Sequence, residues 1–151
     1  MKTFAVIGLG RFGRTVASQL FSMGYEVLAV DINEELVNDI SPFVTYAAAA
    51  DAKDEAVLKE LGVRNYDCAV VGITENLSDS ILITLLLKEM GVKRVLCKAL
   101  DENHKKILDK IGADYVIIPE DEVGVKTALH LASNSFFDWA ELSSRYGIGD
   151  I

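Results

Sequence analysis

Cysteine and long apolar runs are both scarce in this sequence. The 151 residues include two cysteines, Cys68 and Cys97, each inside a short apolar run. Such residues favour buried thiols in a reducing compartment over a disulfide framework or a metal site. The longest apolar run, residues 81–87, contains Thr84 and is followed by charge, and no run approaches the ~20 residues that cross a bilayer. We therefore expect no direct membrane insertion.

Basic residues are outnumbered by acidic ones. The chain has 15 Lys and Arg against 23 Asp and Glu, a net charge of −8, which disfavours nucleic acid and anionic membrane as partners. The start lacks a signal-peptide pattern, because Lys2 is followed at once by a short strand-like run. Half of the residues are hydrophobic and a quarter are charged. This balance predicts one cytoplasmic globular domain with a core of its own.

Catalytic motifs are missing as well. No tyrosine is followed four residues later by lysine, as in short-chain reductases, and no G-K-[ST] marks a P-loop. His104 and His130 are isolated, and no basic neighbour in the strand would activate either cysteine. A dehydrogenase also needs an acid or base beside the nicotinamide. We therefore predict no catalytic residue, no metal ligand and a binding module, with a fragment of an NAD-dependent oxidoreductase or nucleotide-sugar enzyme as the alternative.

Short β-like runs alternate with helix-like segments along the chain. Near-continuous apolar runs such as residues 27–30 are typical of parallel strands covered on both faces. Six β–α units predict an α/β fold, a Rossmann-type doubly wound parallel six-stranded sheet. The expected strands are 4–8, 26–31, 44–48, 68–73, 94–99 and 115–118, and the expected helices are 12–23, 34–40, 51–61, 76–90, 103–111 and 122–140. The helix over 103–111 is expected to present a basic face of His104, Lys105, Lys106 and Lys110.

Three glycines spaced G-x-G-x-x-G follow the first expected strand and open the first helix. Gly8 permits a sharp turn, Gly10 lets a pyrophosphate approach the backbone, and Gly13 lets the helix pack closely on the sheet. Amide groups at the helix start then face the phosphates. Asp31 ends the second strand 18 residues after Gly13, close to the ~20 expected for the acid that accepts ribose hydroxyls. We predict an adenine nucleotide site here.

Other candidate binding residues follow from the topology of parallel sheets, in which ligands bind beyond the carboxyl ends of the strands. Arg11 lies at the helix start, where it can contact phosphate, and Asp51, Ala52 and Lys53 are candidate adenine contacts. The predicted cofactor-binding residues are Gly8, Gly10, Arg11, Phe12, Gly13, Asp31, Ile32, Asn33, Asp51, Ala52, Gly72, Ile73 and Lys98. The residues do not rank NAD(H) against ATP/ADP, because both contain adenosine and phosphates.

Longer motifs resemble a known family. The stretches "VIGLGRFG", "GYEVLAVDINEE", "LLLKEMGVKRVLCKALDENHKKILDKIGADYVIIPE" and "GVKTALHL" are similar to the regulator-of-potassium-conductance domain, also called the Trk-A N-terminal domain. The chain looks most like the cytosolic regulatory subunits of bacterial Ktr-type potassium uptake systems. The resemblance covers about residues 3–140. It implies a cytoplasmic ligand sensor that binds NAD(H) or ATP/ADP. It also implies homodimers that assemble into a ring, often octameric, beneath a membrane potassium-translocating subunit.

The resemblance also implies roles for particular residues. Arg11 would reach a γ-phosphate near the subunit boundary, Asp31 would hold the ribose, and Lys98 matches a basic residue at the end of the fifth strand. Glu120 matches a glutamate near the dimer interface that is sometimes linked to a cation. Lys98 and Leu100 replace the paired acids of calcium-gated relatives, which argues against that type of site.

The C-terminal part is expected to contact a partner subunit. The resemblance implies a crossover helix, and the apolar side chains of Ala128, Leu129, Leu131, Phe136, Phe137 and Trp139 fit that role. Family members usually carry a second ligand domain after this helix. We therefore expect a nucleotide-binding domain over residues 1–140 and the start of a linker over residues 141–151.

Overall fold

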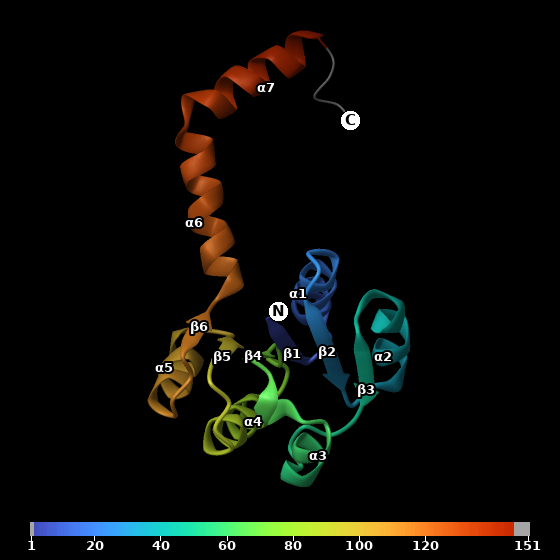
Figure 1. Ribbon diagram of the computed structural model, residues 1–151. Coiled ribbons are helices and arrows are strands. Elements are labelled where there is room, and N and C mark those ends of the chain that lie inside the picture. The colour runs from blue at the N-terminus through green and yellow to red at the C-terminus, as the bar shows by residue number, and fades with distance from the viewer. Residues whose placement is uncertain (1, 147–151) are drawn as a thin grey trace. The chain divides into compact units, whose positions relative to one another are not determined.

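The computed structural model describes residues 2–146, apart from the side chains of Asn134, Phe136, Phe137, Arg145 and Tyr146. It divides into two compact units, one up to Ile118 and one from Pro119 onward. Figure 1 shows the helices and strands of both units. The expected boundary at residue 140 separates a nucleotide-binding domain from a linker, whereas this division is by compactness alone. The expected boundary therefore stays a prediction.

The first unit is built on a parallel six-stranded sheet, as the alternating pattern predicts. Its strands lie in the order β3-β2-β1-β4-β5-β6, so the chain winds outward from β1 in both directions. This order defines the doubly wound Rossmann type. The strands are β1 (Thr3–Ile7), β2 (Glu26–Asp31), β3 (Tyr46–Ala49), β4 (Cys68–Val71), β5 (Val95–Lys98) and β6 (Tyr115–Ile117).

Helices cover both faces of this sheet (Figure 1). Those on one face are α1 (Arg11–Ser22) and α2 (Glu34–Ile40), followed by the short helix η1 (Ser41–Phe43). Those on the other face are α3 (Glu55–Glu60), α4 (Leu77–Glu89) and α5 (Glu102–Lys110), with the short helix η2 (Val63–Asn65) after α3.

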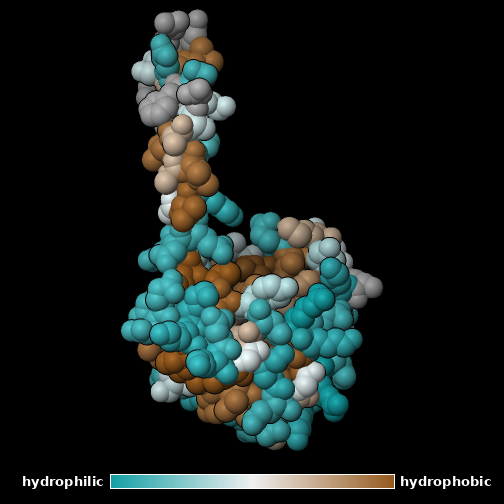
Figure 2. All heavy atoms as spheres, turned by 90° about the vertical axis from the view of Figure 1, so that its left-hand side faces the viewer, coloured by the Kyte–Doolittle hydropathy of each residue, from teal (hydrophilic) through white to brown (hydrophobic). Residues whose placement is uncertain are grey.

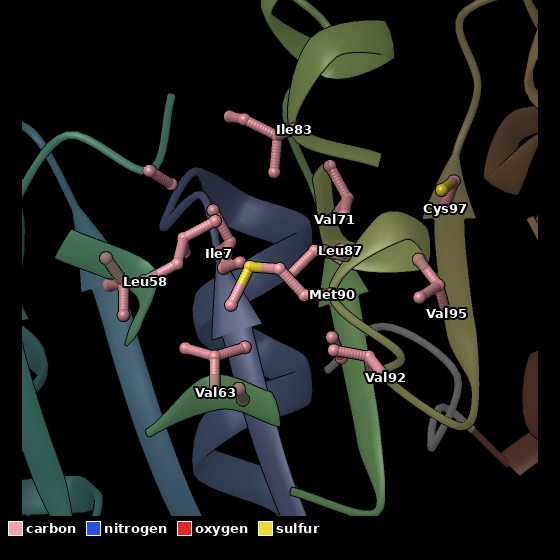
Figure 3. Packing of buried hydrophobic residues seen from close by; sticks show 14 of the residues in the cluster. Ile7, Leu58, Val63, Val71, Ile83, Leu87, Met90, Val92, Val95 and Cys97 are labelled. Carbon is pink, nitrogen blue, oxygen red and sulfur yellow. The ribbon is translucent and has the colours of Figure 1, made fainter. Parts of the chain in front are cut away.

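The two hydrophobic layers follow the alternation of side chains along the strands. In β1, Ala5 and Ile7 face the α3–α4–α5 layer, whereas Val6 faces the α1–α2 layer. Figure 3 shows the first of these layers, where Ile7 packs near Leu58 of α3 and Leu87 of α4. All three are at most 1% exposed. Burial on both faces explains why the strand sequences are continuously apolar.

Two local expectations in the first unit are wrong. The third helix begins at Glu55 rather than Asp51, because the Asp54 carboxylate accepts a hydrogen bond from Ala56 N and caps it. In α5, His104 does not belong to a basic outer face: it is 1% exposed and bonded to α4, with its Nε2 3.0 Å from Ser80 Oγ. The strands and remaining helices of this unit agree with the expected ones to within a few residues.

The second unit consists of two helices, α6 (Pro119–Ala132) and α7 (Asn134–Tyr146). The single helix expected over 122–140 is therefore wrong. It breaks at Ser133, whose Oγ and main-chain N both donate to the carbonyl of His130 and so close the last turn of α6. Within residues 2–146, no helix combines the length and apolar character needed to cross a bilayer.

Candidate nucleotide-binding site

The glycine loop has the geometry that its spacing predicts. Gly8 leaves β1 with φ of +95°, a conformation that side chains rarely adopt. A Cβ at Gly13 would lie 1.7 Å from the carbonyl oxygen of Gly8, so α1 can approach the strand exit only with glycine there. At Gly10 a Cβ would meet nothing within 4 Å. The space beside the Gly10 backbone is therefore open.

Asp31 is held rigidly at the end of β2. Its Oδ2 accepts a hydrogen bond from Leu9 N at 2.7 Å, and its Oδ1 accepts one from Asn33 N at 2.8 Å. The carboxylate thus ties the glycine loop to the loop that follows β2. A carboxylate has about four acceptor positions on its two oxygens, so each oxygen keeps capacity for a ribose hydroxyl. Oriented in this way, Asp31 can accept two hydroxyls at once.

The loop after Asp31 is shaped by a helix cap. Asn33 Oδ1 accepts hydrogen bonds from Glu35 N at 2.9 Å and Leu36 N at 3.4 Å and so caps α2. Ile32, between the two polar residues, is 70% exposed. It offers an apolar surface beside the carboxylate, against which the flat face of a base can pack.

The loop after β3 forms a second wall. Ala50 N donates to the carbonyl of Asp31 at 3.0 Å, which joins the ends of β2 and β3. Asp51 Oδ1 accepts from Lys53 N at 3.0 Å, and Ala52 is 5% exposed and packed in the core. Asp51 therefore shapes a turn, while Asp54 caps the helix.

The segment between β4 and α4 closes the site on a third side. Ile73 touches the glycine loop, since a Cβ at Gly8 would lie 2.8 Å from its Cγ1. Asn76 caps α4 by accepting from Asp79 N at 3.2 Å. The carboxylate of Asp79 lies 3.6 Å from Lys53 Nζ of the opposite wall.

These walls enclose a cavity of about 290 Å³, near the lower end of the ~300–1,000 Å³ typical of small-molecule sites. Seven predicted residues line it: Gly8, Asp31, Ile32, Asn33, Asp51, Ala52 and Ile73. Lys53, considered with Asp51 as an adenine contact, lines it too. The sequence analysis does not predict the remaining lining residues, which are Ile7, Val30, Leu36, Ala50, Glu75, Asn76, Asp79 and Ile83. The cap at Asn76 was the available signal, because it places the start of α4 at the same edge of the sheet.

The other predicted residues lie outside this cavity, around the start of α1. They are Gly10, Arg11, Phe12, Gly13, Gly72 and Lys98. Lys98 Nζ lies 5.8 Å from the centroid of the Phe12 ring, so the end of β5 contributes a cation beside the helix start. A Cβ at Gly72 would be 3.3 Å from the carbonyl oxygen of Gly8 and 3.6 Å from Phe12 Cδ2, and Gly72 therefore allows close packing.

Charge is distributed unevenly over the two parts of the site. Four carboxylates, those of Asp31, Asp51, Glu75 and Asp79, line the cavity with one cation, Lys53. Arg11 and Lys98 lie instead with the amide groups that begin α1. A phosphorylated nucleoside is favoured in one orientation, with its sugar and base in the acidic cavity and its phosphates at α1.

The thiols of Cys68 and Cys97 are not suited to react with a ligand in this site. Burial raises the pKa of Cys97 to about 11 and also raises the pKa of Cys68. A raised pKa keeps a thiol protonated and less reactive. Cys97 is buried as predicted, whereas Cys68 is only partly buried. Among residues 2–146, no group of three His, Cys, Asp or Glu side chains is arranged to hold a metal ion.

The strand order, the glycine loop and the acid that ends β2 together define a Rossmann-type nucleotide-binding domain. Residues 4–119 match the model of the TrkA-N domain family, and the chain belongs to that family.

Two relatives match almost the whole chain. Ktr system potassium uptake proteins C and A of Bacillus subtilis (strain 168) are 45% and 46% identical to it over 150 residues. Each alignment covers 99% of this chain and 68% of the relative. The resemblance seen in the sequence is thereby confirmed.

Solved structures share the fold at lower identity. The TrkA-N domain of inner membrane protein ybaL from Escherichia coli has a TM-score of 0.77 at 16% identity, over 87% of this chain and 97% of that one. Shewanella denitrificans Kef CTD in its AMP-bound form has a TM-score of 0.69 at 18% identity, over 98% and 94%. The GsuK channel bound to NAD has a TM-score of 0.68 at 16% identity, over 78% and 21%.

Proposed function

We propose that this chain is the nucleotide-sensing regulatory domain of a potassium uptake system. It binds an adenine nucleotide, NAD(H) or ATP/ADP, and acts in the cytoplasm at the inner face of the cell membrane through a potassium-translocating subunit. Homodimers assemble into a ring, an octamer in this proposal, and exchange of the nucleotide changes the ring and so gates the partner. Such a change requires that the ligands differ in affinity for the two arrangements.

One observation carries the ligand part of this proposal: the Asp31 carboxylate, fixed by Leu9 N and Asn33 N, lines the acidic cavity beside the glycine loop. The names of the Bacillus subtilis relatives support the potassium part. Two structural neighbours contain NAD or AMP, which supports an adenine nucleotide.

Apolar surfaces support the assembly part. Within α6 no residue is buried, and the apolar side chains of Val123, Val125 and Leu129 are each more than 60% exposed. Figure 2 shows apolar side chains along this helix. On α4, Leu82 and Leu85 are 40% and 37% exposed, although the opposite face of the helix is buried in the core. Apolar helix surfaces of this kind favour contact with other chains.

The ligand part is tested by calorimetry with ADP, ATP and NADH on wild type and Asp31→Ala. We expect micromolar or tighter binding to the wild type. Loss of the ribose hydrogen bonds, each worth about 1.5–3 kcal/mol to a charged acceptor, should weaken every ligand about tenfold or more. The matched control is Asp39→Ala, an exposed acid on α2 outside the cavity, which should bind as wild type does.

Two results would overturn the proposal. The first is a wild-type protein that binds none of the three nucleotides. The second is Asp31→Ala protein that is folded and retains full affinity. The oxidoreductase alternative is tested by incubating the protein with NADH and a panel of carbonyl compounds. That alternative requires NADH to be oxidised faster with the protein than in buffer alone.

A further inference from the structure

Two segments face each other across the base end of the cavity. One is the loop of residues 50–54 between β3 and α3, and the other is residues 73–79, which lead into α4. A single ion pair joins them: Lys53 Nζ lies 3.6 Å from Asp79 Oδ1. The two side chains are 39% and 31% exposed, and both line the cavity. The pair therefore stands at the boundary between cavity and solvent.

The backbone on each side of this pair is fixed. Lys53 N donates to Asp51 Oδ1, and the neighbouring Ala52 is packed in the same core cluster as Ile83 of α4. Asp79 is in the first turn of α4, where its own N–H is bonded to the cap and its charge is favoured by the helix dipole. Opening the pair thus requires rotation of two side chains rather than movement of the loops.

We propose that Lys53 and Asp79 form a strap across the cavity, which must open for a nucleotide to enter or leave. This inference rests on the proposed nucleotide site. With the ribose at Asp31 and the phosphates at α1, the base lies toward Lys53 and Asp79. A bound base displaces water from between the segments and lowers the local dielectric, which strengthens the closed pair. The strap slows exchange of the nucleotide, in addition to any effect on affinity.

The effect of removing one or both partners distinguishes a closing ion pair from two residues that contact the ligand independently. If each residue touched the base separately, removing both would combine the two effects. If the pair acts by closing, breaking it from either side has the same result, and removing the second partner adds nothing. A double-mutant cycle on the dissociation rate measures this difference directly.

The experiment uses the whole chain loaded with radiolabelled ADP, the moiety shared by NAD(H), ATP and ADP, and chased with unlabelled ADP. Lys53→Met, Asp79→Asn and the double variant should each release ADP about two- to fivefold faster than wild type, the range for a partly exposed ion pair. The double variant should be no faster than either single one. Added salt should accelerate release more from wild type than from the double variant, in which only the phosphate contacts remain to be screened.

The controls use a pair outside the cavity and a conservative change. Lys59→Met and Glu55→Gln break the exposed Lys59–Glu55 pair of α3, 3.4 Å apart, and should release ADP at the wild-type rate. Lys53→Arg should stay near that rate too. Rates that are additive, or unchanged in all variants, overturn the strap. A wild type that binds no ADP overturns the proposed function instead.

Discussion

Gly10 and Gly13 lie in the same loop, but a methyl group would meet different surroundings at the two positions. At Gly13 it would collide with the carbonyl oxygen of Gly8, whereas at Gly10 it would have open space. The same substitution therefore separates a structural role from a binding role.

We expect Gly13→Ala to lower the free energy of unfolding by several kcal/mol, although alanine ordinarily stabilises a helix by about 1 kcal/mol relative to glycine. Gly10→Ala should cost about 1 kcal/mol or less, because Gly10 has a φ of −67° that alanine also adopts. That variant should nevertheless lose most of its affinity for ADP, since its Cβ would occupy the space that the proposed site assigns to the pyrophosphate. Urea unfolding and calorimetry on the two proteins measure both effects. Equal behaviour in both assays would contradict this division of roles.

At the scale of the elements, α4 and α5 are joined through a buried polar network. His104 Nδ1 accepts from Leu100 N at 2.9 Å, and its Nε2 lies 3.0 Å from Ser80 Oγ. Because Nδ1 accepts a main-chain N–H, the ring is neutral, with its proton on Nε2. Thr84 extends the network with hydrogen bonds to Ser80 O and toward Cys97. The network holds the loop after β5 against α4.

This network makes stability depend on pH. Burial lowers the pKa of His104 from 6.5, with a smaller opposing effect from the Asp101 carboxylate. Below about pH 6.5 the His104 imidazole binds a proton more readily in the unfolded chain than in the folded protein. The free energy of unfolding therefore falls as pH decreases. We expect the urea midpoint to drop between pH 7.5 and pH 5.5 in wild type, and to drop less in His104→Gln. A flat wild-type profile over this interval would contradict the argument.

The sequence predicts the elements of this fold better than their ends. The apolar runs of β1 and β2 and the glycine spacing indicate the sheet and its loop, because buried parallel strands leave a pattern that few other structures share. Asp51 and Asp54 are both suitable caps, and local pattern alone does not choose between them. Asp114 of the "IGAD" stretch shows its role only in three dimensions, since it accepts from Val95 N and Lys88 Nζ and anchors β5.

The residues of the candidate site also differ in how well the sequence predicts them. Asp31 and the glycine loop are adjacent to recognisable strands, so their positions follow from local pattern. Asp79 and Glu75 come from a segment that only the winding of the sheet brings opposite Lys53. Their contribution depends on tertiary structure, so local sequence pattern does not predict it.

At the scale of the whole molecule, the two units differ in how they use apolar residues. The first buries them in two layers, whereas α6 leaves its own exposed. One side of α6 carries a shallow groove lined by Pro119, Glu120, Val123, Gly124, Thr127, Ala128 and Leu131. Phe136 and Phe137, expected at the same interface, have side chains outside the described part of the chain.

If this groove is the dimer interface, a charge on the groove side of α6 should dissociate the dimer. Val123 lies in the groove, and Val125, equally exposed at 61% against 62%, lies on the other side of the helix because each residue turns it by about 100°. Light scattering after size exclusion should show Val123→Glu as a smaller species than wild type, because its α6 contact is lost, and Val125→Glu as the wild-type assembly. Both should bind ADP through the first unit. Identical masses for the two variants would exclude the groove.

The two hydrogen bonds that fix the Asp31 carboxylate limit which differences between nucleotides that group can detect. Two main-chain amides leave that group no freedom to adapt, so it responds in the same manner to every molecule that carries adenosine. In the proposed function, the sugar end would therefore register occupancy, and the identity of the nucleotide would be registered at the opposite end, near Arg11 and Lys98, because bound phosphate groups differ in number and charge.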